Sequence, residues 1–400
     1  MQGNQNQILG DKNLIKGDLN GVAGNQNIVA GNSNLLQGNV NSVLGNSNGL
    51  KGDYNVINNG NNNAIVGNNN GIANGNYNTI VGGSNAIIGS ENGILGNKNA
   101  IMGDKNYLEG NYNQVAGNQN GVWGNSNIAV GDSNSIKGNQ NYLQGSWNAV
   151  QGNSNGILGN QNLINGNANA VAGNSNGIAG SFNSVIGGYN GIIGDKNSVS
   201  GNSNGILGNQ NLINGNSNNI AGYSNGIAGS FNSVIGGYNG IIGDKNSVSG
   251  SYNGILGNQN VVQGNTNTVG GNYNGISGSS NTVAGSYNGI IGGNNGVLGN
   301  SNGVLGNHNV IQGNHNAVGG NSNGINGSSN SVIGSYNGIG GDQNIVQGNY
   351  NGILGDNNAI GGSWNNVRGD QNGILGDKNV VNGNTNLILG NQNGIQGSNN

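Results

Sequence analysis

The chain has 400 residues, of which 86 are Gly and none is Pro or Cys. Only 6% of the residues are charged and the formal net charge is -3, so the composition offers no basic surface for nucleic acid. No apolar run approaches the roughly 20 residues of a membrane-spanning helix, and the lack of Pro excludes a collagen helix.

The whole chain is built from one seven-residue repeat, Gly-x-x-Asn-x-(Ile/Val)-x. Counting Gly as position one, 56 complete units follow one another from Gly3, and Gly and Asn occupy positions one and four in all of them. Position six is Ile or Val in 51 units and Leu or Ala in the others. Because position six is so regularly aliphatic, the chain is not expected to be disordered. One aliphatic residue and one Gly per heptad also argue against a coiled coil.

Positions four to seven of each unit predict a four-residue β-strand whose alternate side chains share a face. Asn and Ile/Val would then point inward, positions five and seven outward, and Gly at position one would form a corner with positive φ. Stacked turns would arrange the inward Asn side chains as a hydrogen-bonded ladder, because a buried amide without partners costs about 1–3 kcal/mol. Core positions expected on this basis include Asn155, Ile157, Asn204, Ile206, Asn211 and Ile213.

The first thirteen residues enter the repeat at once. They show neither the basic start nor the apolar stretch of a signal peptide. Neither end of the sequence resembles the cap that a solenoid normally carries, so we expect the chain to be part of a longer protein.

Two single-residue insertions, Asn59 and Asn74, end the eighth and tenth units. With two units per turn they would fall at the same corner of successive turns, where one bulge can stack on the other. With three units per turn they would fall at different corners. We therefore predict an all-β, parallel β-solenoid with 14 residues per turn, in which the 56 units give about 28 turns. It would be a single continuous domain over residues 1–400, roughly 130 Å long at about 4.8 Å per turn.

Tandem Asn-x-Val-x-Gly segments, such as "NSVSG", "NTVGG" and "NTVAG", give the chain a family resemblance along its whole length. They resemble the ryegrass-type ice-binding proteins of grasses, which are left-handed parallel β-rolls with two heptads per turn and inhibit ice recrystallisation. The resemblance implies a left-handed roll, an extracellular location, and ice as the partner of one flat face rich in small and hydroxyl-bearing residues.

Candidate ice-binding residues are hydroxyl side chains at the outward position five that recur 14 residues apart. They form the pairs Ser184 and Ser198, Ser233 and Ser247, and Thr268 and Thr282. This chain departs from rows of Thr, because position five is Gly in 21 units. A large apolar residue often follows at position seven, as at Leu158, Ile193, Leu207, Ile242 and Leu256. The result is a corrugated apolar surface.

An internal duplication bears on which face is active. Residues 152–200 recur at 201–249 with four changes in 49 positions. The copy is seven units long, or three and a half turns, so each copied unit falls on the opposite face. Either both faces bind the partner, or neither face depends on a precise arrangement of side chains to recognise it.

Two functions from different classes remain open. The first is ice binding through a flat roll face, and the second is a structural or adhesive stalk whose apolar columns associate sideways with other copies. The corner aromatic residues are also open to two interpretations, packing over the turn above or stacking on a carbohydrate. Ten of the 13 Tyr residues lie at position three, together with Trp147, Trp364, Phe182 and Phe231.

We expect no catalytic residues, no metal site, no cofactor and no enzymatic activity. Eleven of the 13 carboxylates are Asp at position two, scattered along the chain rather than repeated in successive turns as in a calcium-binding roll. His308 and His315 fall on opposite edges of the predicted roll, without Cys or carboxylate neighbours. Edge residues so regularly spaced do not assemble a Ser-His-Asp group.

Overall fold

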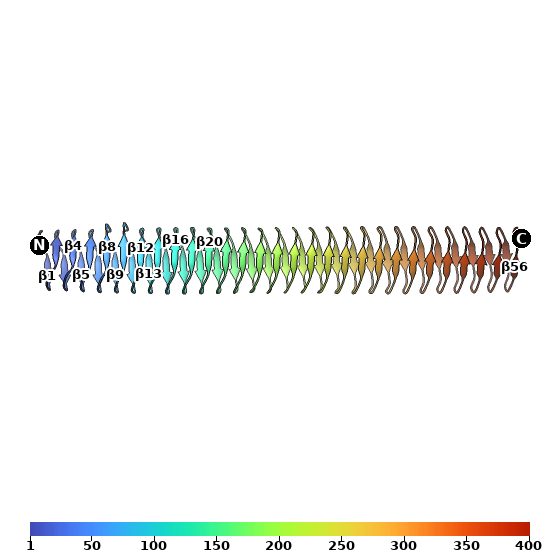
Figure 1. Ribbon diagram of the computed structural model, residues 1–400, viewed down its shortest axis with the longest axis horizontal. Coiled ribbons are helices and arrows are strands. Elements are labelled where there is room, and N and C mark those ends of the chain that lie inside the picture. The colour runs from blue at the N-terminus through green and yellow to red at the C-terminus, as the bar shows by residue number, and fades with distance from the viewer. The chain divides into compact units, whose positions relative to one another are not determined.

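The computed structural model describes all 400 residues and contains 56 strands of three residues each, with no helix. The chain divides into two units, residues 1–202 and 203–400. The first unit contains strands β1 (Gln7–Leu9) to β28 (Ser198–Ser200), and the second contains β29 (Gly205–Leu207) to β56 (Gly394–Gln396). Within each unit the strands follow one another in chain order (Figure 1).

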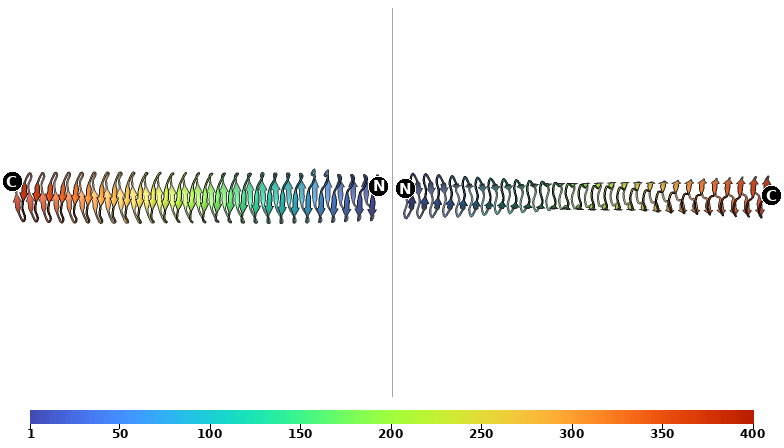
Figure 2. Two further views of the ribbon diagram at one scale, coloured as in Figure 1. Left: turned by 180° about the vertical axis from the view of Figure 1, so that it is seen from behind. Right: turned by 90° about the horizontal axis from the view of Figure 1, so that it is seen from below.

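Each unit is a roll of two parallel sheets, one of odd-numbered and one of even-numbered strands. On the odd-numbered sheet, β39 (Gly275–Ser277) pairs with β41 (Gly289–Ile291). On the even-numbered sheet, β38 (Thr268–Gly270) pairs with β40 (Thr282–Ala284). Partners are 14 residues apart, which confirms the prediction of two heptads per turn. The two sheets appear as separate layers when a unit is viewed edge-on (Figure 2, right).

The core is the space between the two sheets, filled by the aliphatic residues of position six. The predicted core residues Ile157, Ile206 and Ile213 are 1%, 4% and 0% exposed. Burying each such side chain contributes about 1.5–3 kcal/mol to folding. A single aliphatic column on each sheet therefore holds the layers together.

The Asn side chains of position four form continuous ladders along the roll. The amide Nδ2 of Asn288 donates to Oδ1 of Asn274 in the preceding turn (3.1 Å) and to the carbonyl oxygen of Gly299 in the next (2.9 Å). No buried side-chain nitrogen or oxygen lacks a hydrogen-bond partner. The predicted Asn ladder is thus confirmed. Among its buried members are Asn155, Asn204 and Asn211.

The strands are one residue shorter than the sequence predicts, because they cover positions five to seven and not four to seven. The backbone N–H of Asn288, at position four, donates to the side-chain Oδ1 of Asn274 (3.0 Å). In a parallel sheet that N–H would bond to a backbone carbonyl. Here a side-chain oxygen replaces the backbone carbonyl as acceptor, so backbone pairing between the strands starts one residue later.

Each corner contains two residues with positive φ. Gly278, at position one, has φ +142°, and a Cβ there would overlap the carbonyl oxygen of Gly292 in the next turn. Position three is also left-handed, with φ near +60° at Tyr273 and Tyr287. This second position was not predicted, because Tyr, Gln, Lys and Ser do not favour positive φ.

The two insertions stack at one corner, as predicted. Asn59 and Asn74 follow β8 (Val56–Asn58) and β10 (Gly71–Ala73), and their φ angles are 59° and 52°. Asn59 Nδ2 donates to Asn74 Oδ1 across 3.3 Å. One bulge therefore supports the other.

Candidate functional site

Only positions five and seven of each strand point outward, so each sheet face presents two columns of side chains. These columns carry almost no charge. In residues 203–400 the single charged outward side chain is that of Arg368 on β52 (Asn366–Arg368). The first unit has four, Lys16, Lys51, Glu109 and Lys137.

The two predicted Thr residues lie side by side on the even-numbered sheet. Thr268 and Thr282 are direct partners in the register of β38 and β40, and both are exposed. Position seven of the same strands is Gly270 and Ala284, so this part of the face has only small side chains. Large side chains return on the neighbouring strands, at Leu256 and Leu298.

The Ser pairs are also in register but do not join the Thr pair. Ser184 and Ser198 are partners on β26 (Ser184–Ile186) and β28. Ser233 and Ser247 are partners on β33 (Ser233–Ile235) and β35 (Ser247–Ser249). In residues 203–400 this second pair lies on the sheet opposite Thr268 and Thr282. The predicted hydroxyls thus form separate two-residue patches.

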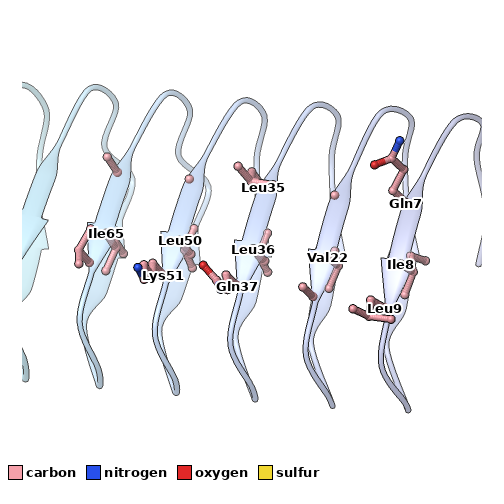
Figure 3. Close-up of a pocket in the computed structure, with 15 residues that line it drawn as sticks. Gln7, Ile8, Leu9, Val22, Leu35, Leu36, Gln37, Leu50, Lys51 and Ile65 are labelled. Atoms are coloured by element: carbon pink, nitrogen blue, oxygen red, sulfur yellow. The ribbon is translucent and has the colours of Figure 1, made fainter.

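Shallow hollows occur on the outer faces. One of about 700 Å³ extends over odd-numbered strands from β37 (Val261–Gln263) to β47 (Ser331–Ile333). No residue of the opposite sheet lines it, so it lies on the outside of the roll. A hollow of about 590 Å³ covers the odd-numbered strands from β1 to β9 (Ala64–Val66) in the first unit, and Figure 3 shows Leu9, Gln37 and Lys51 along one side of it.

Apolar side chains of position seven form ridges on the outer faces. Leu207, Ile242 and Leu256 are 58%, 59% and 62% exposed, and Ile242 and Leu256 are neighbours on the even-numbered sheet. Leu158 and Ile193 are similarly exposed in the first unit. The faces therefore alternate between small-residue patches and apolar ridges.

Position two forms a second ladder, which the sequence analysis missed. The N–H of Ser286 donates to Asn300 Oδ1 in the next turn (2.7 Å), and the N–H of Asn300 donates to Asn314 Oδ1 (2.7 Å). In this outer ladder each backbone N–H donates to a side chain of the next turn, whereas in the inner Asn ladder it donates to a side chain of the preceding turn. The available signal was the abundance of Asn, Asp and Ser at position two, since all three have an acceptor oxygen close to the backbone.

The carboxylates are not all scattered, contrary to the sequence analysis. Asp342, Asp356 and Asp370 occupy position two in successive turns. Backbone N–H groups donate to Oδ1 of Asp356 (2.7 Å) and of Asp370 (2.8 Å), as they do to Asn and Ser elsewhere in the outer ladder. No group of three or more His, Cys, Asp or Glu side chains is placed to hold a metal ion, and this includes the surroundings of His308 and His315.

Some of the aromatic rings at the corners stack on one another. Tyr336, Tyr350 and Trp364 form a column with centroid separations of 4.8 and 4.3 Å and nearly parallel planes. Tyr273 and Tyr287 stack in the same way at 4.9 Å. A sugar ring would need a free aromatic face, and within these columns the rings cover one another's faces. For the rings in these columns, the geometry therefore favours corner packing.

A model of the grass antifreeze β-roll family matches residues 40–131, 123–208 and 202–292. These segments overlap and together cover more than half of the chain. The chain belongs to the grass antifreeze β-roll family. The third segment of this antifreeze β-roll contains Thr268 and Thr282, and the match confirms the resemblance carried by the Asn-x-Val-x-Gly segments.

A search of curated proteins finds no match to this antifreeze β-roll. Its family is one of ice-binding, non-enzymatic rolls, which supports ice binding in general and suggests that the chain is not an enzyme. The structure contains no apolar helix of the length needed to cross a membrane.

Proposed function

We propose that this antifreeze β-roll binds ice through a flat outward sheet face and so inhibits ice recrystallisation. The observation that carries the proposal is the patch around Thr268 and Thr282. There, two hydroxyl side chains are held in register one turn apart, on strands that carry no charged side chain.

A crystal surface repeats at fixed intervals, and so does a stack of β-turns, with neighbouring strands about 4.8 Å apart. Thr is stiff at χ1, so little side-chain freedom is lost on binding. Its hydroxyl both donates and accepts hydrogen bonds, as water in ice does. A stiff row of such groups suits an ordered array of water molecules.

Small neighbours let the patch approach a flat surface. Gly270 and Ala284 do not rise above the Thr side chains. A Lys in place of Gly270 or Ala284 would carry a hydrated charge into the contact. We propose that the pairs Ser184 with Ser198 and Ser233 with Ser247 make contacts of the same kind. The buried columns that include Asn204 and Ile206 hold the two sheets together.

Inhibition of recrystallisation would follow from adsorption. A crystal boundary that is pinned at adsorbed molecules must grow as curved segments between them, and curvature raises the free energy of the growing ice. The apolar ridges at Leu207 and Ile242 are the one observation that favours the stalk alternative, since exposed apolar patches commonly mark contacts between molecules.

The experiment compares the wild-type chain with the double substitution Thr268→Lys and Thr282→Lys. We expect the substitution to raise the protein concentration needed to slow crystal coarsening in frozen sucrose. The matched control is Thr266→Lys with Ser280→Lys, which places two Lys one turn apart in the same heptads but at the corner, where Lys occurs naturally, as at Lys245. This control should act like wild type.

Wild-type protein that leaves coarsening unchanged would contradict the proposal. If the mass measured by light scattering then showed bundles that disperse when Leu207 and Ile242 are replaced by Lys, the stalk function would be supported instead.

A further inference from the structure

The two outward faces of residues 203–400 present the same kind of surface. On the odd-numbered sheet, three Gly residues of position five are in register, and the even-numbered sheet has a matching column. The first column is Gly275, Gly289 and Gly303, and the second is Gly226, Gly240 and Gly254. No charged side chain points outward on either sheet within these strands.

The fold does not require these glycines. Gly275, Gly289 and Gly240 have no positive φ, and a Cβ built on any of them would meet no atom within 4 Å. Gly278, at position one, differs on both counts. A Gly inside a strand weakens it, and often marks a place where a ligand or another backbone approaches closely. Both faces carry this mark.

The hydroxyl patches are also divided between the faces. Ser233 and Ser247 lie on the odd-numbered sheet of residues 203–400, and Thr268 and Thr282 lie on the even-numbered sheet. The Ser pair comes from the duplicated segment, and its counterparts in the first copy, on β26 and β28, belong to even-numbered strands. The duplicated outward sequence is thus compatible with either sheet, which a roll with one specialised face would not tolerate.

We propose that both sheet faces of residues 203–400 bind ice, an inference that rests on the function proposed above. A roll with two equivalent faces adsorbs whichever way up it meets a crystal. It can also lie between two crystals, with one face on each.

Single cysteines test this directly, because the chain has no Cys of its own. Thr282→Cys places a thiol on the even-numbered face and Gly289→Cys places one on the odd-numbered face, on consecutive strands. Ser280→Cys places a third at the exposed corner that precedes Thr282 and serves as the control. The measurement is the rate of thiol alkylation of the full chain, in an ice slurry and in ice-free supercooled buffer at the same temperature.

With the whole sample adsorbed on ice, we expect alkylation of both face cysteines to slow by about twofold, because each face is then covered in about half of the molecules. The corner cysteine should react at its ice-free rate. Circular dichroism establishes that each variant is folded, and Gly303→Cys replaces Gly289→Cys if the latter does not fold.

Retention of the chain by ice with only one face cysteine protected would overturn the two-face inference and leave the proposed function standing. Retention with neither protected would also overturn it, because the contact would then lie outside these faces. A chain that ice does not retain would contradict the proposed function itself.

Discussion

Glycine occurs in the repeat for two different reasons, as Gly275 and Gly278 show within a single turn. Gly278 is required by its φ of +142° and by the carbonyl of Gly292 that lies where a Cβ would be. Gly275 is in an ordinary strand with open space around it. At position three, where φ near +60° would suit Gly, the chain instead places Tyr, Gln, Lys or Ser.

We expect the two glycines to respond oppositely to the same substitution. Gly275→Ala should be neutral or stabilising by about 0.4–1 kcal/mol, because Ala has fewer conformations in the unfolded chain. Gly278→Ala should destabilise the fold by about 1–3 kcal/mol or more through backbone strain and overlap. Urea denaturation midpoints measure both, and equal shifts would show that position five is constrained like position one.

The inner ladder predicts a large effect at Asn204. Its Oδ1 accepts from both the N–H and Nδ2 of Asn218 (3.0 and 3.1 Å), and its Nδ2 donates to the carbonyl of Gly215 (2.9 Å). Asn204→Leu would leave these buried groups without partners, at about 1–3 kcal/mol each. The outward control Ser247→Ala should change the free energy of unfolding by no more than about 0.5 kcal/mol. If chemical denaturation found the two variants equally stable, the hydrogen-bonded ladder would not be the reason why position four is always Asn.

At the scale of the strand, three residues are too few to stand alone, and stability comes from pairing with the turn before and the turn after. The corner bulges at Asn59 and Asn74 obey the same rule, since each is supported by the other across 3.3 Å. A bulge without its partner distorts the neighbouring turns.

We therefore expect deletion of Asn59 alone to lower the thermal midpoint more than deletion of Asn59 and Asn74 together. The double deletion restores uniform 14-residue turns, whereas the single deletion leaves one unsupported bulge. Thermal melts followed by circular dichroism compare the three chains. A double deletion less stable than the single one would mean that the bulges act independently.

The sequence predicts the strands, the core and the register because each depends on residue type at a fixed period. Asn recurs at position four without exception, Ile or Val occupies position six in 51 of the 56 units, and Asn59 and Asn74 select two heptads per turn. It does not predict that the strand starts after Asn, because a side chain there replaces a backbone acceptor. It also misses the left-handed position three, since Tyr and Lys do not favour that conformation, and the outer ladder at position two. Candidate hydroxyls such as Thr268 and Thr282 are predictable as neighbours, but their role depends on a partner outside the chain.

At the scale of the whole molecule, the heptad register of the sequence passes from residue 200 to residue 205 without an insertion. From this we predict one continuous roll over residues 1–400, roughly 130 Å long at about 4.8 Å per turn. Small-angle X-ray scattering of the purified chain should give a maximum dimension near that value and the profile of a thin rod. A profile of two bodies joined by a hinge would contradict the prediction.

The central claim, that the chain binds ice, is tested most directly by ice-affinity partitioning. A crystal is grown slowly in a dilute solution of the wild-type chain, and the protein concentration is measured in the ice and in the remaining liquid. We predict that the chain enters the ice, that Thr268→Lys with Thr282→Lys lowers its share there, and that Thr266→Lys with Ser280→Lys does not. Exclusion of the wild-type chain from the ice, at the level of an unrelated soluble protein in the same solution, would contradict the claim.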